Sequence, residues 1–279
     1  MLKLLSSDFS RLWKNKFFYI LFGGTGVYTL WFMLVTSFNA KQLQTRPSLE
    51  SYYFQFALFI GAICAFFCSM FFGTEYSDGT IRNKVIVGSK RVDIYISRLI
   101  VTFSATVIIM CAWLVAALVA VPALGFFKME IKNVLLLLLI FVFTVAAFSS
   151  LFTLVSILSV NKASTVVISV VLFFVIFFLS FFLYSALQQP EMITDYTSIE
   201  FVDGVMTGSD SRVIPNPIYV GGVKRKVYEF LLDFLPCGQG FQVFLLKIAN
   251  PLRMILSSFS ITVVTTLCGI FAFKKKNLK

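Results

Sequence analysis

Residues 133–160, NVLLLLLIFVFTVAAFSSLFTLVSILSV, decide the fold class of this chain. The stretch contains no Asp, Glu, Lys or Arg, and it is longer than the roughly 20 apolar residues that a helix needs to cross a bilayer. Five further segments share this character: about 17–38, 52–73, 97–123, 165–187 and 252–273. None has an ionisable residue at its centre, where a charge would cost at least about 2.5 kcal/mol. The sequence therefore predicts an all-α membrane protein with six transmembrane helices.

The composition agrees with this class. Hydrophobic residues make up 58% of the 279 residues, charged residues make up 13%, and the mean hydropathy is +0.89. These values are too apolar for a soluble domain of this length. The chain has no His and no carboxylate pair within a predicted span, which argues against a bound metal and against an intramembrane enzyme.

Lysine and arginine near the span ends predict the orientation in the membrane. With six spans both termini lie on one side, and that side collects most of the short-loop cations: Lys3, Arg11, Lys14, Lys16, Arg82, Lys84, Lys90, Arg91, Arg98, Lys162, Lys274, Lys275, Lys276 and Lys279. The opposite short loops hold Lys41, Arg46, Lys128 and Lys132. We therefore expect a multi-pass protein of a bacterial plasma membrane with both termini in the cytoplasm. The net charge of +11 is mostly this topology signal, and we expect no nucleic-acid partner.

Both ends of the chain are basic. Apolar residues recur at helical spacing along residues 1–16: Leu2, Leu5, Phe9, Leu12 and Trp13. This spacing predicts an amphipathic helix in the membrane interface, with lipid headgroups as partners of its basic side; a frayed cytoplasmic leader is the alternative. We expect residues 17–38 to be an uncleaved first span, because bulky Phe38 stands where signal cleavage needs a small residue. Residues 274–279 form a basic cytoplasmic tail.

Small residues recur every four positions along the second span: Ala57, Gly61, Ala65, Ser69 and Gly73. In lipid, helices associate through close backbone approach and van der Waals contact, so this stripe predicts a helix-packing seam. The neighbour that packs on it is either another helix of the same chain or a second subunit.

Between the second and third spans lies the short basic segment 75–91, EYSDGTIRNKVIVGSKR. Ser77 or Asp78 predicts the N-cap of a helix over residues 80–87, and Gly88 suits its C-terminal stop. The helix would turn the apolar side chains of Ile81 and Val85 to the bundle. It would turn the polar side chains to the cytosol: Arg82, Asn83 and Lys84. The segment is either a helix that transmits force from an attached protein or an interfacial loop that obeys the positive-inside rule.

The motif in and after this segment is an acidic residue, Gly-Thr, a basic amphipathic turn and a basic residue that leads into the third span. It is carried by Glu75, Gly79-Thr80-Ile81-Arg82-Asn83-Lys84, Gly88-Ser89-Lys90-Arg91 and Tyr95-Ile96-Ser97-Arg98. This run resembles the first cytoplasmic loop of ABC-2-type transporter permeases, and the six-span layout and the interfacial N-terminal helix match that family too. Arg98 stands where relatives often carry lysine.

The resemblance implies that the segment is a coupling helix docked in a groove of an ABC ATPase subunit. The implied contact residues are Glu75, Gly79, Thr80, Ile81, Arg82, Lys84, Val85, Gly88 and Arg91. It also implies a second permease chain, identical or paralogous. The ATPase must be a separate polypeptide that binds ATP and Mg, because this chain has no phosphate-binding loop: Gly23-Gly24-Thr25-Gly26 lacks the lysine and lies in an apolar span, where its glycines would ease helix packing. We therefore expect no cofactor in this chain and no enzymatic activity of its own.

The outer segment 188–251 precedes the last span. Residues 190–222 are rich in Pro, Gly, Asp and Ser and predict an irregular cap. Two amphipathic pieces follow, separated by Pro236-Cys-Gly-Gln-Gly240 as a helix breaker, and they predict a re-entrant helical hairpin in the outer leaflet. A soluble loop with local structure is the alternative. The resemblance implies an outer gate in this hairpin: Phe230, Phe234, Pro236, Phe241 and Phe244.

Together these features predict a permease subunit that exports a hydrophobic or amphiphilic molecule, such as an antimicrobial peptide. The competing hypothesis is a non-transport membrane scaffold or sensor that holds a different cytoplasmic partner through the same basic loop. The 34 phenylalanines do not identify the substrate, because an AT-rich genome would also favour them.

Overall fold

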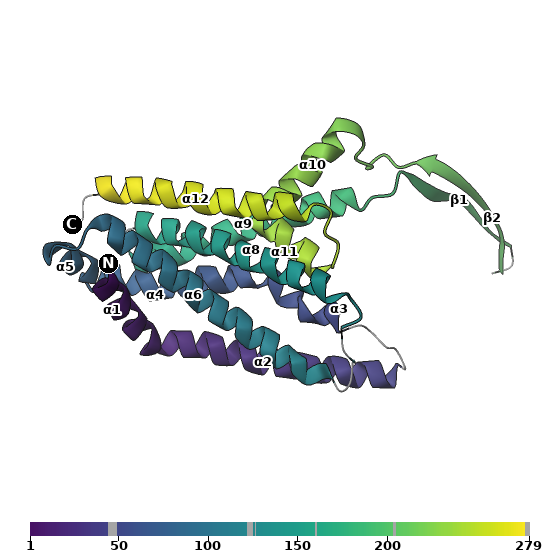
Figure 1. The fold of residues 1–279 in the computed structure, drawn as a ribbon. Helices are drawn as coiled ribbons and strands as arrows, with labels where there is room; N and C mark the ends of the chain where they lie inside the picture. The colour runs from purple at the N-terminus through teal and green to yellow at the C-terminus, as the bar shows by residue number, and fades with distance from the viewer. Residues whose placement is uncertain (44–48, 122–124, 126, 160, 203–204, 277–279) are drawn as a thin grey trace.

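The fold is described from a computed structural model of the chain, which describes residues 1–43, 49–121, 125, 127–159, 161–202 and 205–276. Six long helices run side by side in an elongated bundle (Figure 1): α2 (Lys16–Gln42), α4 (Ile60–Ser77), α6 (Arg91–Ala117), α8 (Ile131–Leu158), α9 (Lys162–Leu187) and α12 (Pro251–Lys275). Five of these, all but α4, are long and apolar enough to cross a membrane, and α4 together with a short helix bent from it makes a possible sixth span. The prediction of an all-α membrane protein with several spans is confirmed at this level.

Shorter elements close the two ends of the bundle. They are α1 (Leu2–Trp13), α3 (Glu50–Tyr53), the 3-10 helix η1 (Gln55–Leu58), α5 (Thr80–Ile86), the 3-10 helix η2 (Leu118–Ala120), α10 (Gly222–Phe234) and α11 (Pro236–Phe244). Figure 1 shows α1, α5 and both chain termini at one end of the bundle. The same figure shows α10 and a β-hairpin at the opposite end.

Helix α8, which contains most of the stretch quoted first, is the central helix. It packs against α12, α4, α6, α11 and α9, and Phe141, Phe148 and Phe152 along it are fully buried. Because lipid offers no hydrophobic drive for helix pairing, these rings hold the bundle through close contact rather than through expulsion of water.

Helices α8 and α9 form an antiparallel pair joined by a short connection. The side chain of Asn161 accepts a hydrogen bond of 2.8 Å from the backbone N–H of Ser164, and the Ser164 hydroxyl oxygen accepts one of 3.4 Å from the backbone N–H of Asn161. This capping box satisfies orphan donors at the start of α9 and fixes where the second helix begins.

The part of the small-residue stripe that lies in α4, from Gly61 to Gly73, packs inside the chain, chiefly against α9. A Cβ atom added to Gly61 would lie 2.6 Å from Phe148 and 2.8 Å from Phe173, and one added to Gly73 would lie 2.9 Å from the Lys162 side chain. The Ser69 hydroxyl donates to the Ala65 carbonyl at 2.6 Å and lies 3.3 Å from the Thr165 carbonyl. At these positions the stripe therefore packs against helices of the same chain rather than against a second subunit.

The predicted second span, 52–73, is interrupted at the end farther from α5. Helix α4 begins only at Ile60, after α3 and η1. The irregular backbone is tolerated because the Trp113 indole N–H donates to the Tyr53 carbonyl at 3.0 Å, and the Trp113 ring stacks on Phe56 at a centroid distance of 4.9 Å.

A β-hairpin replaces the irregular cap that we expected at 190–222. Strand β1 (Met192–Val202) pairs antiparallel with β2 (Val205–Pro215), with Met192 opposite Pro215 and Val202 opposite Val205. The prediction weighted Gly, Asp and Ser and overlooked alternating β-branched and aromatic residues, which favour strands. Asp203-Gly204, a common hairpin-turn dipeptide, was the sequence signal for this connection, although these two residues lie outside the described part of the structure.

Candidate functional site

Helix α5 is a seven-residue helix at the end of the bundle that holds both termini (Figure 1). The chain bends by 62° between residues 60–75 of α4 and α5. Gly79, with φ +66°, is the N-cap in place of the predicted Ser77 or Asp78, because this left-handed backbone favours glycine. At the other end Gly88 has φ +90°, and its N–H donates to the Val85 carbonyl at 3.0 Å, which matches the predicted stop.

The apolar side of α5 contacts the bundle. Ile81 is 2% exposed and belongs to a cluster with Tyr95, Ile157 and Phe273, and half-buried Val85 packs against the same cluster. The other members of this cluster come from α6, α8 and α12, so the apolar side of α5 is buried where these three long helices meet.

Glu75, at the end of α4, is the centre of a buried charge network. Its carboxylate is 1% exposed and accepts hydrogen bonds from Arg98 of α6 and Arg11 of α1. The Lys84 ammonium of α5 donates to it at 2.7 Å. The Arg11 and Arg98 guanidinium groups also lie over the rings of Phe71 and Phe72, at 4.5 and 4.8 Å from the ring centroids.

Asp8 of α1 is the second carboxylate of this network. It is 1% exposed and accepts from Lys84 at 2.7 Å and from the Ser97 hydroxyl of α6 at 2.6 Å. We define the charge network as Asp8, Arg11, Glu75, Lys84, Ser97 and Arg98, which joins α1, α4, α5 and α6. Buried charges are costly to desolvate, so each depends on its partners, and the loss of one partner leaves the others badly solvated.

The charge network corrects our interpretation of α1 and shows which residues the sequence reasoning missed. Arg11 was expected to face lipid headgroups, and instead it reaches Glu75 inside the bundle. Asp8 and Ser97 were given no role. The signal for Asp8 was its position as an acidic residue within an otherwise basic amphipathic helix. Trp13 and Leu2 remain exposed on α1, at 50% and 82%.

Arg91 and Lys276 bind the ends of helices. The Arg91 guanidinium donates to the carbonyls of Phe273, Lys274 and Lys276 at 2.7–2.9 Å, which caps the C-terminus of α12. The Lys276 ammonium donates to carbonyls at the C-terminus of α8, including that of Ser159 at 2.6 Å. Burial lowers the pKa of Lys276 to about 8, so most of the group is still charged at neutral pH. A cation at a helix C-terminus also interacts favourably with the helix dipole.

Of the predicted contact residues, Glu75, Lys84 and Arg91 are engaged within the chain, Ile81 and Val85 pack on the bundle, and Arg82 is exposed. Among the described side chains of α5 and its C-terminal end, the solvent-exposed ones are Arg82, Asn83, Ile86 and Val87. We call these four the α5 outer face. Ile86 and Val87 are 71% and 84% exposed, and neither was among the predicted contact residues.

Helix α11, at the opposite end, is inserted between α8, α9, α10 and η1. It begins at Pro236, so the segment Pro236–Gly240 is its first turns and not the helix breaker that we predicted. Proline at the first helical position loses no hydrogen bond, which explains the start. The glycines permit close contact, since a Cβ at Gly238 would lie 2.1 Å from the Leu232 carbonyl and one at Gly240 would lie 2.6 Å from that of Ala57.

A glutamine inside α11 ties this helix to the bundle. Gln239 is fully buried, and its carbonyl oxygen accepts from the hydroxyls of Thr144 of α8 at 2.8 Å and Ser258 of α12 at 2.6 Å. Its amide N–H groups donate to the backbone carbonyls of Asp233 and Met254 at 2.9 and 3.0 Å. All four hydrogen-bonding positions of this amide are used, and the sequence reasoning had overlooked the residue.

The predicted gate residues do not form one cluster. Phe241 is buried and packs on α9, with its ring parallel to that of Tyr184 at a centroid distance of 6.0 Å. Phe230 is half exposed on α10 and stacks with Phe234 at 6.1 Å. Pro236 is buried, and Phe244 is half-buried at the end of α11.

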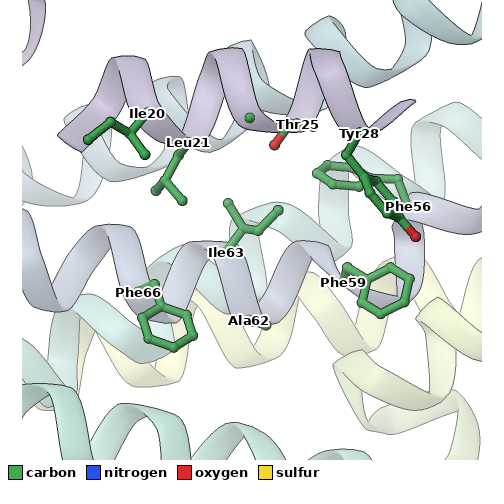
Figure 2. A pocket seen from close by; sticks show the side chains of 10 residues that line it. Ile20, Leu21, Thr25, Tyr28, Phe56, Phe59, Ala62, Ile63 and Phe66 are labelled. Atoms are coloured by element: carbon green, nitrogen blue, oxygen red, sulfur yellow. The ribbon is translucent and has the colours of Figure 1, made fainter. Parts of the chain in front are cut away.

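An apolar pocket of about 360 Å³ lies between α2 and the segment formed by η1 and α4 (Figure 2). Its lining side chains carry no charge, and the labelled ones include Leu21, Tyr28, Phe59 and Ile63. Gly24 also lines it, and a Cβ at this position would meet nothing within 4 Å. Within this chain Gly24 therefore makes no close helix contact and lines open space, so the expectation that the α2 glycines ease helix packing is not met by an intramolecular neighbour at this position.

The geometry defines a helical multi-span membrane protein. At one end the charge network holds α5, and at the other end α11 is inserted between neighbouring helices. A family model described as ABC-2 family transporter protein matches residues 4–180, which run from α1 into α9. The match covers more than half of the chain, and the chain belongs to this family. It is thus a permease component of an ABC transporter, and it is the transmembrane component rather than the catalytic one. No curated protein matches the sequence.

Proposed function

We propose that this chain is the permease subunit of an ABC exporter, driven by a separate ATPase that docks on the α5 outer face. The observation that carries the proposal is that α5 presents Arg82, Asn83, Ile86 and Val87 outward while the charge network holds its other side. Partnership with an ABC ATPase follows from the family. An exposed pair of large apolar residues beside a cation is suited to a groove on a protein partner.

The charge network supports a mechanism for coupling. Lys84 of α5 binds both Asp8 of α1 and Glu75 of α4, and Glu75 binds Arg98 of α6. A displacement of α5 by the ATPase would therefore move three neighbouring helices with it, since packed and ion-paired elements move as units. We infer that α1, α4, α5 and α6 form the force-receiving unit of the permease.

A second permease chain, identical or paralogous, completes the proposed transporter. The cargo that we propose is a hydrophobic or amphiphilic molecule, such as an antimicrobial peptide. The apolar pocket between α2 and α4 supports this class, because an uncharged wall admits hydrocarbon and rejects ions. In this arrangement α10 and α11 are a re-entrant hairpin at the outer side, where Phe230 and Phe241 contribute to the gate.

The docking surface is tested by charge reversal at Arg82. The charge network rules out Lys84 for this purpose, because a reversal there would disrupt the buried ion pairs as well as any docking contact. We expect Arg82→Glu to reduce ATPase co-purification and stimulated ATP hydrolysis at least about tenfold, since interfacial charge reversal costs several kcal/mol. Ile86→Asp should have the same effect. Lys90→Glu is the matched control, an exposed cation at the same end but outside α5.

Wild-type ATPase binding by both Arg82→Glu and Ile86→Asp, at normal expression, would show that the α5 outer face is not the docking surface. Reproducible absence of any ATPase from the purified wild-type complex would favour the scaffold or sensor hypothesis. Orientation is tested separately in a cysteine-free background: an impermeant maleimide added to intact cells should label Val223→Cys and not Ser89→Cys. The reverse labelling would place α5 outside and remove the coupling proposal.

A further inference from the structure

A second hollow, of about 380 Å³, lies at the opposite end of the bundle from α5. It is formed by the end of α9, the segment 217–220 and the first half of α10. Its size falls in the range of small-molecule sites, about 300–1,000 Å³. It shares no residue with the apolar pocket of Figure 2.

The polar side chains that line this hollow are all able to donate hydrogen bonds. They are the Ser185 hydroxyl, the Gln189 amide, the Lys224 ammonium and the phenol groups of Tyr219 and Tyr228. None of the lining residues is acidic. Such a site offers positive charge and donors, and therefore suits an anion.

Lys224 is the charged group of the hollow. Its ammonium lies 5.6 Å from the centre of the Tyr228 ring. Within the described residues it makes no ion pair with a carboxylate, and the nearby Glu229 is paired with Arg225 at 3.2 Å. An incoming anion would not have to displace a carboxylate from Lys224.

The walls of the hollow are held in place by Arg225. Its guanidinium donates to the Leu187 carbonyl at the end of α9 at 3.3 Å and to Glu229 on its own helix at 3.2 Å. It also lies over the Tyr219 ring at 5.7 Å from the centroid. These contacts fix α10 to α9, so the hollow does not depend on a ligand for its shape.

An apolar ridge on α9 leads to the hollow. Phe174, Phe178 and Phe182 lie four residues apart on one face of the helix and are 47%, 61% and 57% exposed. The rings of Phe174 and Phe178 stack at 6.0 Å, and Phe182, which lines the hollow, lies 6.3 Å from the Tyr228 ring. An acyl chain could follow this ridge from the anion site into the membrane core.

We propose that the hollow binds the phosphate headgroup of an anionic phospholipid in the leaflet at the α10 end. Lys224 pairs with the phosphate, the phenol and hydroxyl groups donate to its oxygens, and one acyl chain lies on the Phe174–Phe178–Phe182 ridge. The end of a spanning helix with tyrosines around it is the level at which lipid headgroups lie. This inference goes beyond the proposed function, because lipid binding here requires neither the ATPase nor transport.

The test uses the purified full-length chain, delipidated in detergent and titrated with single lipids in native mass spectrometry. We expect phosphatidylglycerol to bind more tightly than phosphatidylcholine, and Lys224→Gln to weaken phosphatidylglycerol binding about tenfold, as for loss of a hydrogen bond to a charged group. Lys226→Gln is the matched control, an exposed cation on the same helix outside the hollow, and should change binding less than twofold. Ser185→Trp, which fills the hollow and keeps Lys224, should also weaken binding.

Several results would overturn the proposal. Equal affinity of Lys224→Gln and Lys226→Gln for phosphatidylglycerol would remove Lys224 from the site, and equal affinity of the wild type for both lipids would show that no anion is recognised. Displacement of bound lipid by millimolar inorganic phosphate, with the same dependence on Lys224, would assign the hollow to free phosphate. If Lys224→Gln does not fold, wild-type lipid binding by Ser185→Trp would be decisive against the site. None of these measurements involves the ATPase, so they fail or succeed independently of the docking experiment.

Discussion

Neutralising Glu75 tests whether the charge network holds the end of the bundle together. Glu75→Gln keeps the size of the side chain and removes the negative charge, which leaves the three cations Arg11, Lys84 and Arg98 in a network with one carboxylate, Asp8. Breaking a buried ion pair by removing one partner costs about 3–5 kcal/mol. At about 2–4 °C per kcal/mol for a chain of this size class, the melting temperature should fall by roughly 6–20 °C.

The assay is thermal unfolding of the purified permease in detergent, followed by tryptophan fluorescence. Asp93→Asn is the control, because Asp93 is at the same end, is partly exposed and lies 3.9 Å from the N-terminal ammonium. An exposed pair of this kind contributes about 0–1 kcal/mol, so its variant should melt within a few degrees of the wild type. A double-mutant cycle with Lys84→Gln then isolates the Glu75–Lys84 contact. If Glu75→Gln melts no lower than Asp93→Asn, the network is not what stabilises this end of the bundle.

Two further predictions concern packing. Gly61→Ala should destabilise the permease by about 1–3 kcal/mol, because the new methyl group would overlap the Phe148 and Phe173 rings. Gly24→Ala should be neutral, because its methyl group meets open space. Equal melting temperatures for the two variants would contradict the packing of α4 on α9. Gln239→Leu should cost several kcal/mol, at about 1–3 kcal/mol for each buried group left unsatisfied, and a variant that melts like the wild type would mean that α11 is held by its apolar contacts alone.

The spans could be predicted from the sequence because the free energy of placing a residue in lipid depends mainly on the residue itself. The central span at 133–160 needs no partner to be recognised, and α8 occupies 131–158. The same holds for local backbone signals: the stop at Gly88 follows from glycine's access to positive φ. The family resemblance of the loop at 75–91 rested on such local signals as well, and the match over residues 4–180 bears it out.

Some local signals were present and were weighed wrongly. The segment from Pro236 to Gly240 predicts a break between two amphipathic pieces, although proline is equally suited to the first position of a helix, where α11 begins. Asp203-Gly204 flanked by β-branched residues indicated a hairpin, and the polar composition of 190–222 concealed it.

Only the tertiary structure decided which charges are partners. Glu75 meets Arg98, 23 residues further along the chain, and Arg11, 64 residues earlier. Nothing in the spacing of these residues distinguishes Lys84, which pairs with two buried carboxylates, from Arg82, which faces outward two residues away. The physical reason is that hydrophobic length is a property of one segment, whereas an ion pair needs two or more segments to approach within a few ångströms, and that approach is set by the packing of the whole bundle.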